Sequence, residues 1–166
     1  NAPWAPVPET YRDRALFDFV AGTNHRVSFD VVAAGTHPGP TIALGDVTVA
    51  ITDGGGIPVF PAGGQPFTTN FLSKGVQDDR NNVVFTFPAG TRGAGLDFTA
   101  PAAEGVTVMA IDRAGHGRST AAQSTTVGFV GFVSEIGIRE IRISAANAPS
   151  STPIVNVGGV RYSRTP

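Results

Sequence analysis

Residues 83–98 read Val-Val-Phe-Thr-Phe-Pro-Ala-Gly-Thr-Arg-Gly-Ala-Gly-Leu-Asp-Phe, and this stretch carries the pattern that decides the fold. Val83, Phe85 and Phe87 fall at every second position, as do Leu96 and Phe98. A period of two is typical of half-buried strands, in which alternate side chains face a core. Proline and glycine separate the two segments, so the stretch predicts two short strands joined by a turn.

The same alternation extends along the rest of the chain. Val106 with Val108 and Val127 with Phe129 are expected on buried strand faces. Further strands are expected at Val27–Val32, Thr41–Leu44, Val47–Thr52, Gly95–Thr99, Val106–Asp112, Thr125–Val133, Ile138–Ser144 and Ile154–Tyr162. The phase of the apolar positions slips before Ile141, which predicts a bulge near Glu140. Ile57–Phe67 contains three prolines and is expected to form an edge strand or a loop.

One helix is expected, over Thr10–Ala21, because Thr10 and Asp13 resemble a capping box and Gly22 is a natural stop. It would close one end of the sandwich. The pattern predicts an all-β fold: an antiparallel two-sheet, jelly-roll-like sandwich with one short N-terminal helix. We expect a proline-rich arm over residues 1–9 and a single β-sandwich domain over residues 10–166.

Composition restricts the classes of function. The chain has 12 basic and 13 acidic residues, so its near-neutral charge argues against a nucleic-acid partner. Cysteine is absent, which excludes disulfides and thiolate chemistry. Nowhere in the sequence does an apolar stretch approach the length of a membrane span, and the first residues lack the pattern of a signal peptide. A mature form or an excised domain is expected.

Several short motifs follow one another along the chain. They are Arg14 with Phe17 ahead of Ser28-Phe29-Asp30, Gly45-Asp46-Val47-Thr48, Val83–Pro88, Gly95-Leu96-Asp97-Phe98, the stretch Gly128–Ser134, and Ile138–Ile143. Together they resemble the exported β-sandwich modules of bacterial proteins that carry a PEP-CTERM sorting tail. The resemblance covers residues 10–162. It implies a jelly-roll sandwich that is secreted or held at the cell surface.

Two features depart from the family pattern. The usual closing Ile-Asp-Asn is replaced by Val155-Asn156-Val157 and an additional Gly158-Gly159, and neither a sorting helix nor a basic tail follows Tyr162. The second departure implies truncation, processing or another export route. The resemblance also makes Asp30, with Asn156, the leading candidate for a calcium site, because calcium prefers carboxylate and carbonyl oxygens. The first departure weakens this site, since Asn156 brings no charge. Asp78 and Asp79 form a second acidic spot, which reads as an ordinary turn.

The segment from Val108 to Ser119, with Asp112-Arg113-Ala114-Gly115-His116, looks like a strand and turn of α/β-hydrolases. Those enzymes place their serine in a Gly-x-Ser-x-Gly elbow, which this sequence lacks. Hydrolase activity is therefore a remote alternative, and residues 113–120 are expected to form a hairpin loop. His25, His37 and His116 are too scattered in the sequence to predict a zinc site.

Exposed aromatic rings would provide a platform for sugars. The candidates are Trp4, Tyr11 and Tyr162, with Phe60 and Phe67 as further ones. We expect a non-catalytic extracellular binding or surface module, with a polysaccharide as its ligand. The alternative is a structural subunit that assembles with copies of itself through its arm and strand edges.

Overall fold

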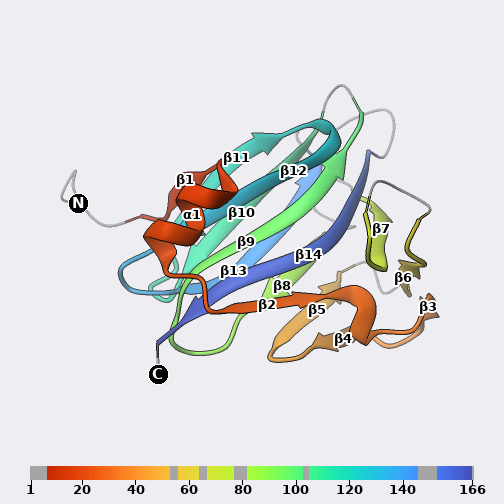
Figure 1. Cartoon of the computed structure of the whole chain (residues 1–166), viewed down its shortest axis with the longest axis horizontal. Helices are drawn as coiled ribbons and strands as arrows, with labels where there is room; N and C mark the ends of the chain where they lie inside the picture. Colours follow the sequence, from red (N-terminus) through yellow and green to blue (C-terminus); the bar gives the residue numbers. More distant parts are fainter. Residues whose placement is uncertain are drawn as a thin grey trace.

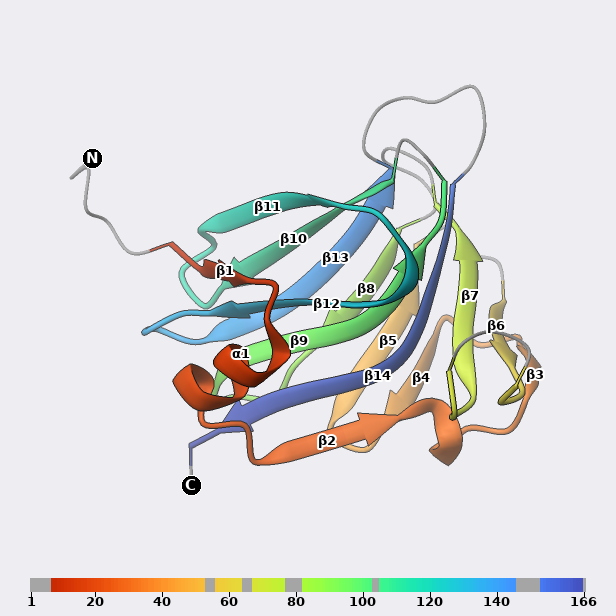
Figure 2. The same ribbon diagram turned by 45° about the horizontal axis from the view of Figure 1, so that its top comes forward.

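A computed structural model describes residues 7–52, 56–63, 67–76, 82–102, 105–145 and 153–165. Strands form two antiparallel sheets that stack face to face (Figures 1 and 2). This confirms the predicted all-β sandwich. Helix α1 (Arg14–Ala21) has only eight residues, and none of the described helices is long and apolar enough to cross a membrane.

The first sheet, sheet A, has eight strands. Its order is β1 (Glu9–Tyr11), β12 (Ser124–Val133), β9 (Thr91–Ala100), β14 (Ile154–Arg164), β7 (Phe71–Gly75), β6 (Ile57–Phe60) and β3 (Gly35–His37), and β2 (His25–Ser28) also pairs with β14. The long strand β14 pairs with β9 along one edge and with β7 and then β2 along the other. It is therefore the central strand of this sheet.

The second sheet, sheet B, has six strands. Its order is β11 (Gly117–Ala122), β10 (Val106–Asp112), β13 (Ile138–Ala145), β8 (Val83–Thr86), β5 (Val47–Ile51) and β4 (Thr41–Leu44). From β8 to β14 the chain crosses repeatedly between the two sheets, which is the jelly-roll-like feature of the fold. Ile111 pairs with Glu140 and Asp112 with Ile138, so Arg139 is an extra residue in β13. The bulge predicted near Glu140 is confirmed.

The core fills the space between the sheets, and its residues come from the alternating positions of the sequence. Val83, Phe85 and Phe87 are buried there, as are Leu96 and Phe98. Val106 and Val108 also belong to this core. Strand alternation therefore predicted these inward-facing residues correctly.

Strand β12 is an exception. Phe129 was expected in the core between the sheets, but it packs on the outer face of sheet A, 5.1 Å from the ring of Phe17. Its neighbours Val130 and Phe132 fill the inner core instead. Val127 lies on the same outer face, so the alternation of the pair was predicted correctly but the face that it buries was not.

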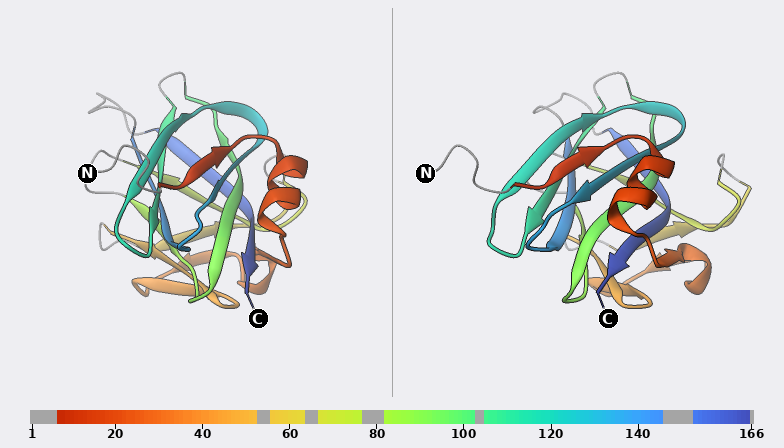
Figure 3. Two further views of the ribbon diagram at one scale, coloured as in Figure 1. Left: turned by 90° about the vertical axis from the view of Figure 1, so that its left-hand side faces the viewer. Right: turned by 60° about the vertical axis from the view of Figure 1, so that its left-hand side comes forward.

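Helix α1 is shorter than the predicted helix Thr10–Ala21, and it does not lie at the end of the sandwich. It begins at Arg14 because the Asp13 side chain accepts a hydrogen bond from the Leu16 amide at 2.9 Å. Glu9–Tyr11, expected in the helix or the arm, forms β1 beside β12. The helix ends at Gly22 as predicted, with φ of 69°. Rather than closing one end, it packs on the outer face of sheet A (Figure 3).

Other segments also differ from expectation. The strand expected over Val27–Val32 ends at Ser28, because the Ser28 hydroxyl accepts the Asp30 amide and caps a 3-10 turn, η1 (Phe29–Val31). Strands β3, β7 and β11 were not expected. In β11 most side chains are exposed, so no apolar alternation marks it.

Candidate functional site

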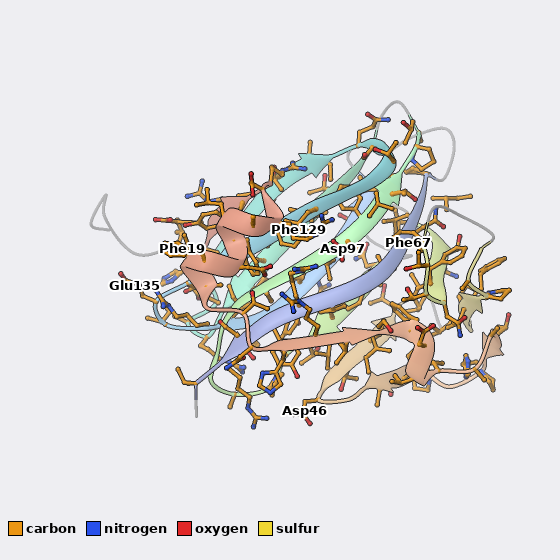
Figure 4. All side chains as sticks on the ribbon, in the orientation of Figure 1. Phe19, Asp46, Phe67, Asp97, Phe129 and Glu135 are labelled. Atoms are coloured by element: carbon orange, nitrogen blue, oxygen red, sulfur yellow. The ribbon has the colours of Figure 1, made fainter. Side chains whose placement is uncertain are left out.

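The outer face of sheet A carries a groove of about 390 Å³ beside the N-terminal end of α1. Its volume is within the range of small-molecule sites, about 300–1,000 Å³. We call it the sheet A groove. It is lined by Arg14, Ser28, Phe67, Thr68, Thr69, Asp97, Val127, Gly158, Gly159 and Arg161. Figure 4 shows Phe129, Asp97 and Phe67 following one another across this face.

Asp97 on β9 lies at the centre of the charged residues in the groove. Arg14 Nε donates a hydrogen bond to Asp97 Oδ1 at 2.8 Å. Arg14 Nη2 lies 2.6 Å from the same oxygen. Arg161 Nη2 lies 3.6 Å from Asp97 Oδ2. Two guanidinium groups from α1 and β14 therefore fix the orientation of one carboxylate.

The second carboxylate of this network, Asp18, belongs to α1. Arg161 Nη1 donates to Asp18 Oδ2 at 2.7 Å, and Arg26 approaches the same oxygen at 3.5 Å. Burial acts to raise the pKa of the Asp18 carboxyl. The Thr23 side chain beside it and the charges of Arg161 and Arg26 outweigh burial, so this pKa is lowered from its ordinary value.

The two arginines also lie over one aromatic ring. The guanidinium carbons of Arg14 and Arg161 are 5.5 and 5.8 Å from the centroid of Phe129. Both distances are within the range of cation–π attraction. The Phe129 ring therefore packs against both guanidinium groups. Sequence alternation had predicted it in the inner core.

Glycines form the floor of the groove. A Cβ on Gly158 would lie 2.2 Å from Phe67 Cδ1, and a Cβ on Gly159 would lie 3.2 Å from Asp97 Oδ2. Only glycine allows the Phe67 ring to approach the strand this closely. Phe67 and Asp97 therefore contact β14 at the Gly158-Gly159 pair. This pair is one of the two departures from the family that the sequence resembles.

An aromatic row begins at one wall of the groove. Phe67 and Phe71 have ring centroids 5.5 Å apart, and Phe71 stacks on Phe60 at 5.6 Å with an interplanar angle of 18°. Phe67 and Phe71 are buried, but Phe60 is 46% exposed. The row therefore leads from the groove to an accessible ring.

The calcium candidates Asp30 and Asn156 have different surroundings. The Asn70 amide donates to Asp30 Oδ1 at 2.8 Å, which ties the segment with Phe67 to η1. Asn156 is buried, and its Nδ2 donates to Thr99 Oγ1 at 2.9 Å. Asn156 Oδ1 has no hydrogen-bond partner among the described residues. Over the same ranges, no three His, Cys, Asp or Glu residues cluster, so calcium at Asp30 stays a prediction.

Of the aromatic candidates from the sequence, Phe67 lines the groove, but Tyr11 and Tyr162 do not. The expectation that Tyr162 is exposed is wrong: it is 1% exposed, packs against Phe87, and burial raises the pKa of its hydroxyl. Tyr11 is half-buried against Phe17, and its hydroxyl donates to Glu9 at 3.1 Å. Trp4 lies outside the described residues, as do Asp78 and Asp79.

The hydrolase-like segment forms a hairpin between β10 and β11. Its loop is shorter than expected, because β11 already begins at Gly117. Asp112 is completely buried and accepts the amides of Ala114 and His116 at 2.9 and 2.8 Å. His116 Nδ1 also lies 3.2 Å from it. All the described strand pairs are antiparallel, unlike the parallel sheet of an α/β-hydrolase.

Sequence reasoning did not single out Arg14, Asp97 or Arg161 as site residues. Two signals were available: Asp97 is a charged residue between the apolar Leu96 and Phe98, and Gly158-Gly159 interrupts the apolar pattern of the last strand. Comparison with known proteins adds nothing further, because no family model and no curated protein matches this chain.

Proposed function

We propose that this protein is a non-catalytic binding module that takes a glycan in the sheet A groove. The observation that carries the proposal is the combination of residues in that groove. Thr68 and Ser28 bring hydroxyl groups, Asp97 an oriented carboxylate, and Val127 an apolar wall. Sugar rings present both hydroxyls and apolar C–H faces, so they complement such a mixed lining.

The aromatic row supports an extended ligand over a single sugar. The exposed Phe60 ring stacks on Phe71, which packs against Phe67 at the groove wall. A flat, accessible ring next to a polar groove offers a second contact for a polysaccharide chain. Export to the cell exterior completes the proposal. It is supported by the resemblance to PEP-CTERM modules, and the lack of cysteine is compatible with it.

The test is a binding measurement with a blocked groove. A tryptophan at Val127 would occupy the groove without removing a member of the charged network. In affinity electrophoresis, a polysaccharide in the gel slows a protein that binds it. We expect Val127→Trp to lose this retardation with any polysaccharide that slows the wild type. Val31→Trp is the matched control, because Val31 is 66% exposed on η1 and does not line the groove. Equal binding by both variants would contradict the groove as the site.

Self-assembly is the second candidate, and the outer surface of α1 favours it. Phe19 is 85% exposed and Leu16, one turn earlier, is 50% exposed. Exposed apolar side chains next to each other are typical of protein–protein contacts. Light scattering at increasing concentration tests this candidate: we expect Phe19→Ser to abolish any increase in mass that the wild type shows. A wild type that stays monomeric would rule assembly out under those conditions.

A further inference from the structure

We propose that the sheet A groove selects neutral glycans over acidic ones, and that the Asp97 carboxylate accepts adjacent hydroxyl groups of the sugar. This inference rests on the proposed glycan-binding function and adds the chemical class of its ligand.

The charged side chains that line the groove are already paired within the protein. Arg14 is bound to Asp97, while Arg161 is bound to Asp18 and approaches Asp97. The remaining lining residues carry no charge. Arg26 adds one cation near Asp18, but its side chain is 66% exposed and therefore screened by solvent.

An acidic ligand would have to compete with these internal pairs. The side chains of Arg161 and Asp97 are only 14% and 21% exposed, so separating them would leave partly buried charges without partners. A carboxylate, sulfate or phosphate on the ligand would also lie close to Asp97. A neutral ligand avoids both costs, since it can bind while the ion pairs stay intact.

Asp97 keeps acceptor capacity for such a ligand. Both contacts from Arg14 go to Oδ1, whereas Oδ2 has only the 3.6 Å contact to Arg161 among the described residues. A carboxylate offers about four acceptor positions. The two guanidinium groups hold Asp97 in one orientation, so its free positions are preorganised for hydroxyl donors.

The walls of the groove fit the same ligand. Val127 and the edge of Phe67 supply apolar surface, and Thr68 is exposed beside them. The Phe67 ring lies directly over Gly158, and the Asp97 carboxylate lies close to Gly159, so both groups reach the surface of β14. A pyranose ring could therefore place hydroxyls at Asp97 and an apolar face against the wall, with Thr68 as a further polar contact.

The experiment measures affinity by isothermal titration for neutral hexasaccharides of glucose, mannose, galactose and xylose, and for hexagalacturonate. We expect at least one neutral hexasaccharide to bind at least tenfold more tightly than hexagalacturonate. Asp97→Asn, which keeps the size of the side chain, should weaken that binding at least tenfold. Asp46→Asn is the matched control, because Asp46 pairs with Arg164 away from the groove, and it should bind like the wild type.

A charge-switch variant extends the test. Asp18→Asn removes the carboxylate that neutralises Arg161 and does not itself line the groove. We expect it to raise the affinity for hexagalacturonate severalfold. If Asp97→Asn does not fold, the double variant Arg14→Gln with Asp97→Asn replaces the ion pair by an amide pair and takes its place.

Each outcome separates the inference from the function on which it rests. Tighter binding of hexagalacturonate than of every neutral sugar would overturn the selectivity but leave glycan binding standing. Unchanged affinity in Asp97→Asn would overturn the role of Asp97. If none of the five hexasaccharides binds, and no polysaccharide slows the wild type in affinity electrophoresis, the proposed function fails together with the inference.

Discussion

The ring of Phe17 on helix α1 lies directly against Gly131 on strand β12, so closely that a Cβ on Gly131 would be 2.7 Å from Phe17 Cδ2. Phe17 is completely buried, although it packs on the outer face of sheet A and not between the sheets. The absence of a side chain at Gly131 therefore allows the helix to lie this close to the sheet.

Gly131→Ala tests this contact. The added methyl group would push the Phe17 ring away, and overpacking of this kind costs about 1–3 kcal/mol. We expect the free energy of unfolding, measured by urea denaturation, to fall by that amount. Gly39→Ala is the control, because its new Cβ would meet only one atom, at an ordinary 3.5 Å. Equal stabilities of the two variants would contradict the close approach of α1.

Asp18 predicts a pH dependence of stability. Its pKa is lowered in the folded protein from an ordinary value of 3.8. Well above pH 3.8 the carboxylate is ionised in both states and contributes its full stabilisation. Below that pH the unfolded chain takes up the proton first, so the contribution declines until the folded carboxyl is also protonated.

Urea denaturation between pH 2 and 7 measures this effect. We expect the wild type to be more stable than Asp18→Asn at neutral pH, and the difference to shrink below the ordinary pKa. The difference between the two proteins isolates Asp18 from the other carboxyl groups. A difference that stays constant over the whole range would show that the ionised carboxylate is not the stabilising species.

Asp112 predicts a graded response in the β10–β11 hairpin. Both backbone amides donate to the same oxygen, Oδ1, of this buried side chain. Asp112→Ala removes both bonds and should cost about 3–6 kcal/mol, since hydrogen bonds to a charged group contribute about 1.5–3 kcal/mol each. Asp112→Asn keeps an oxygen for both donors and should cost less.

His116→Ala is the companion variant for this hairpin. The His116 side chain is 45% exposed, so its contact with Asp112 contributes at most about 1 kcal/mol. Thermal unfolding should therefore place the variants in the order Asp112→Ala, Asp112→Asn, His116→Ala, from least to most stable. His116→Ala as the least stable of the three would contradict the backbone bonds as the main contribution.

Asp30 is predicted to position one wall of the sheet A groove. Because its Oδ1 accepts the Asn70 amide, Asp30→Ala should release the segment that carries Phe67 and Thr68. Amide hydrogen exchange at Asn70 should speed up at least tenfold. Asp30→Asn retains an acceptor oxygen and should preserve most of the protection.

The calcium prediction for Asp30 is separated from this role by titration. If Asp30 binds calcium, calorimetry of the chelated protein should show heat on adding calcium, and Asp30→Ala should abolish it. The calcium prediction is overturned if the wild type shows no heat on adding calcium and no shift in melting temperature. The hydrogen-exchange result would be unaffected.

Alternation in the sequence was sufficient for the sandwich, because a period of two determines which side chains of a strand share a face. It placed Val83, Phe85, Leu96 and Phe98 in the core correctly. It failed for Phe129, since helix α1 covers the outer face of sheet A and creates a second buried surface there, which no local pattern encodes.

Sequence by itself determined the fold class, the bulge beside Glu140 and the end of α1 at Gly22, because each depends on neighbouring residues and backbone preference. Tertiary structure alone decided the groove. Arg14, Asp97 and Arg161 are far apart in the chain and meet only because β9 pairs with β14 while α1 packs on β12 and β9. Electrostatic contacts depend on distance in space, and here that distance is set by strand pairing and by the glycines that let the helix and Phe67 approach the sheet.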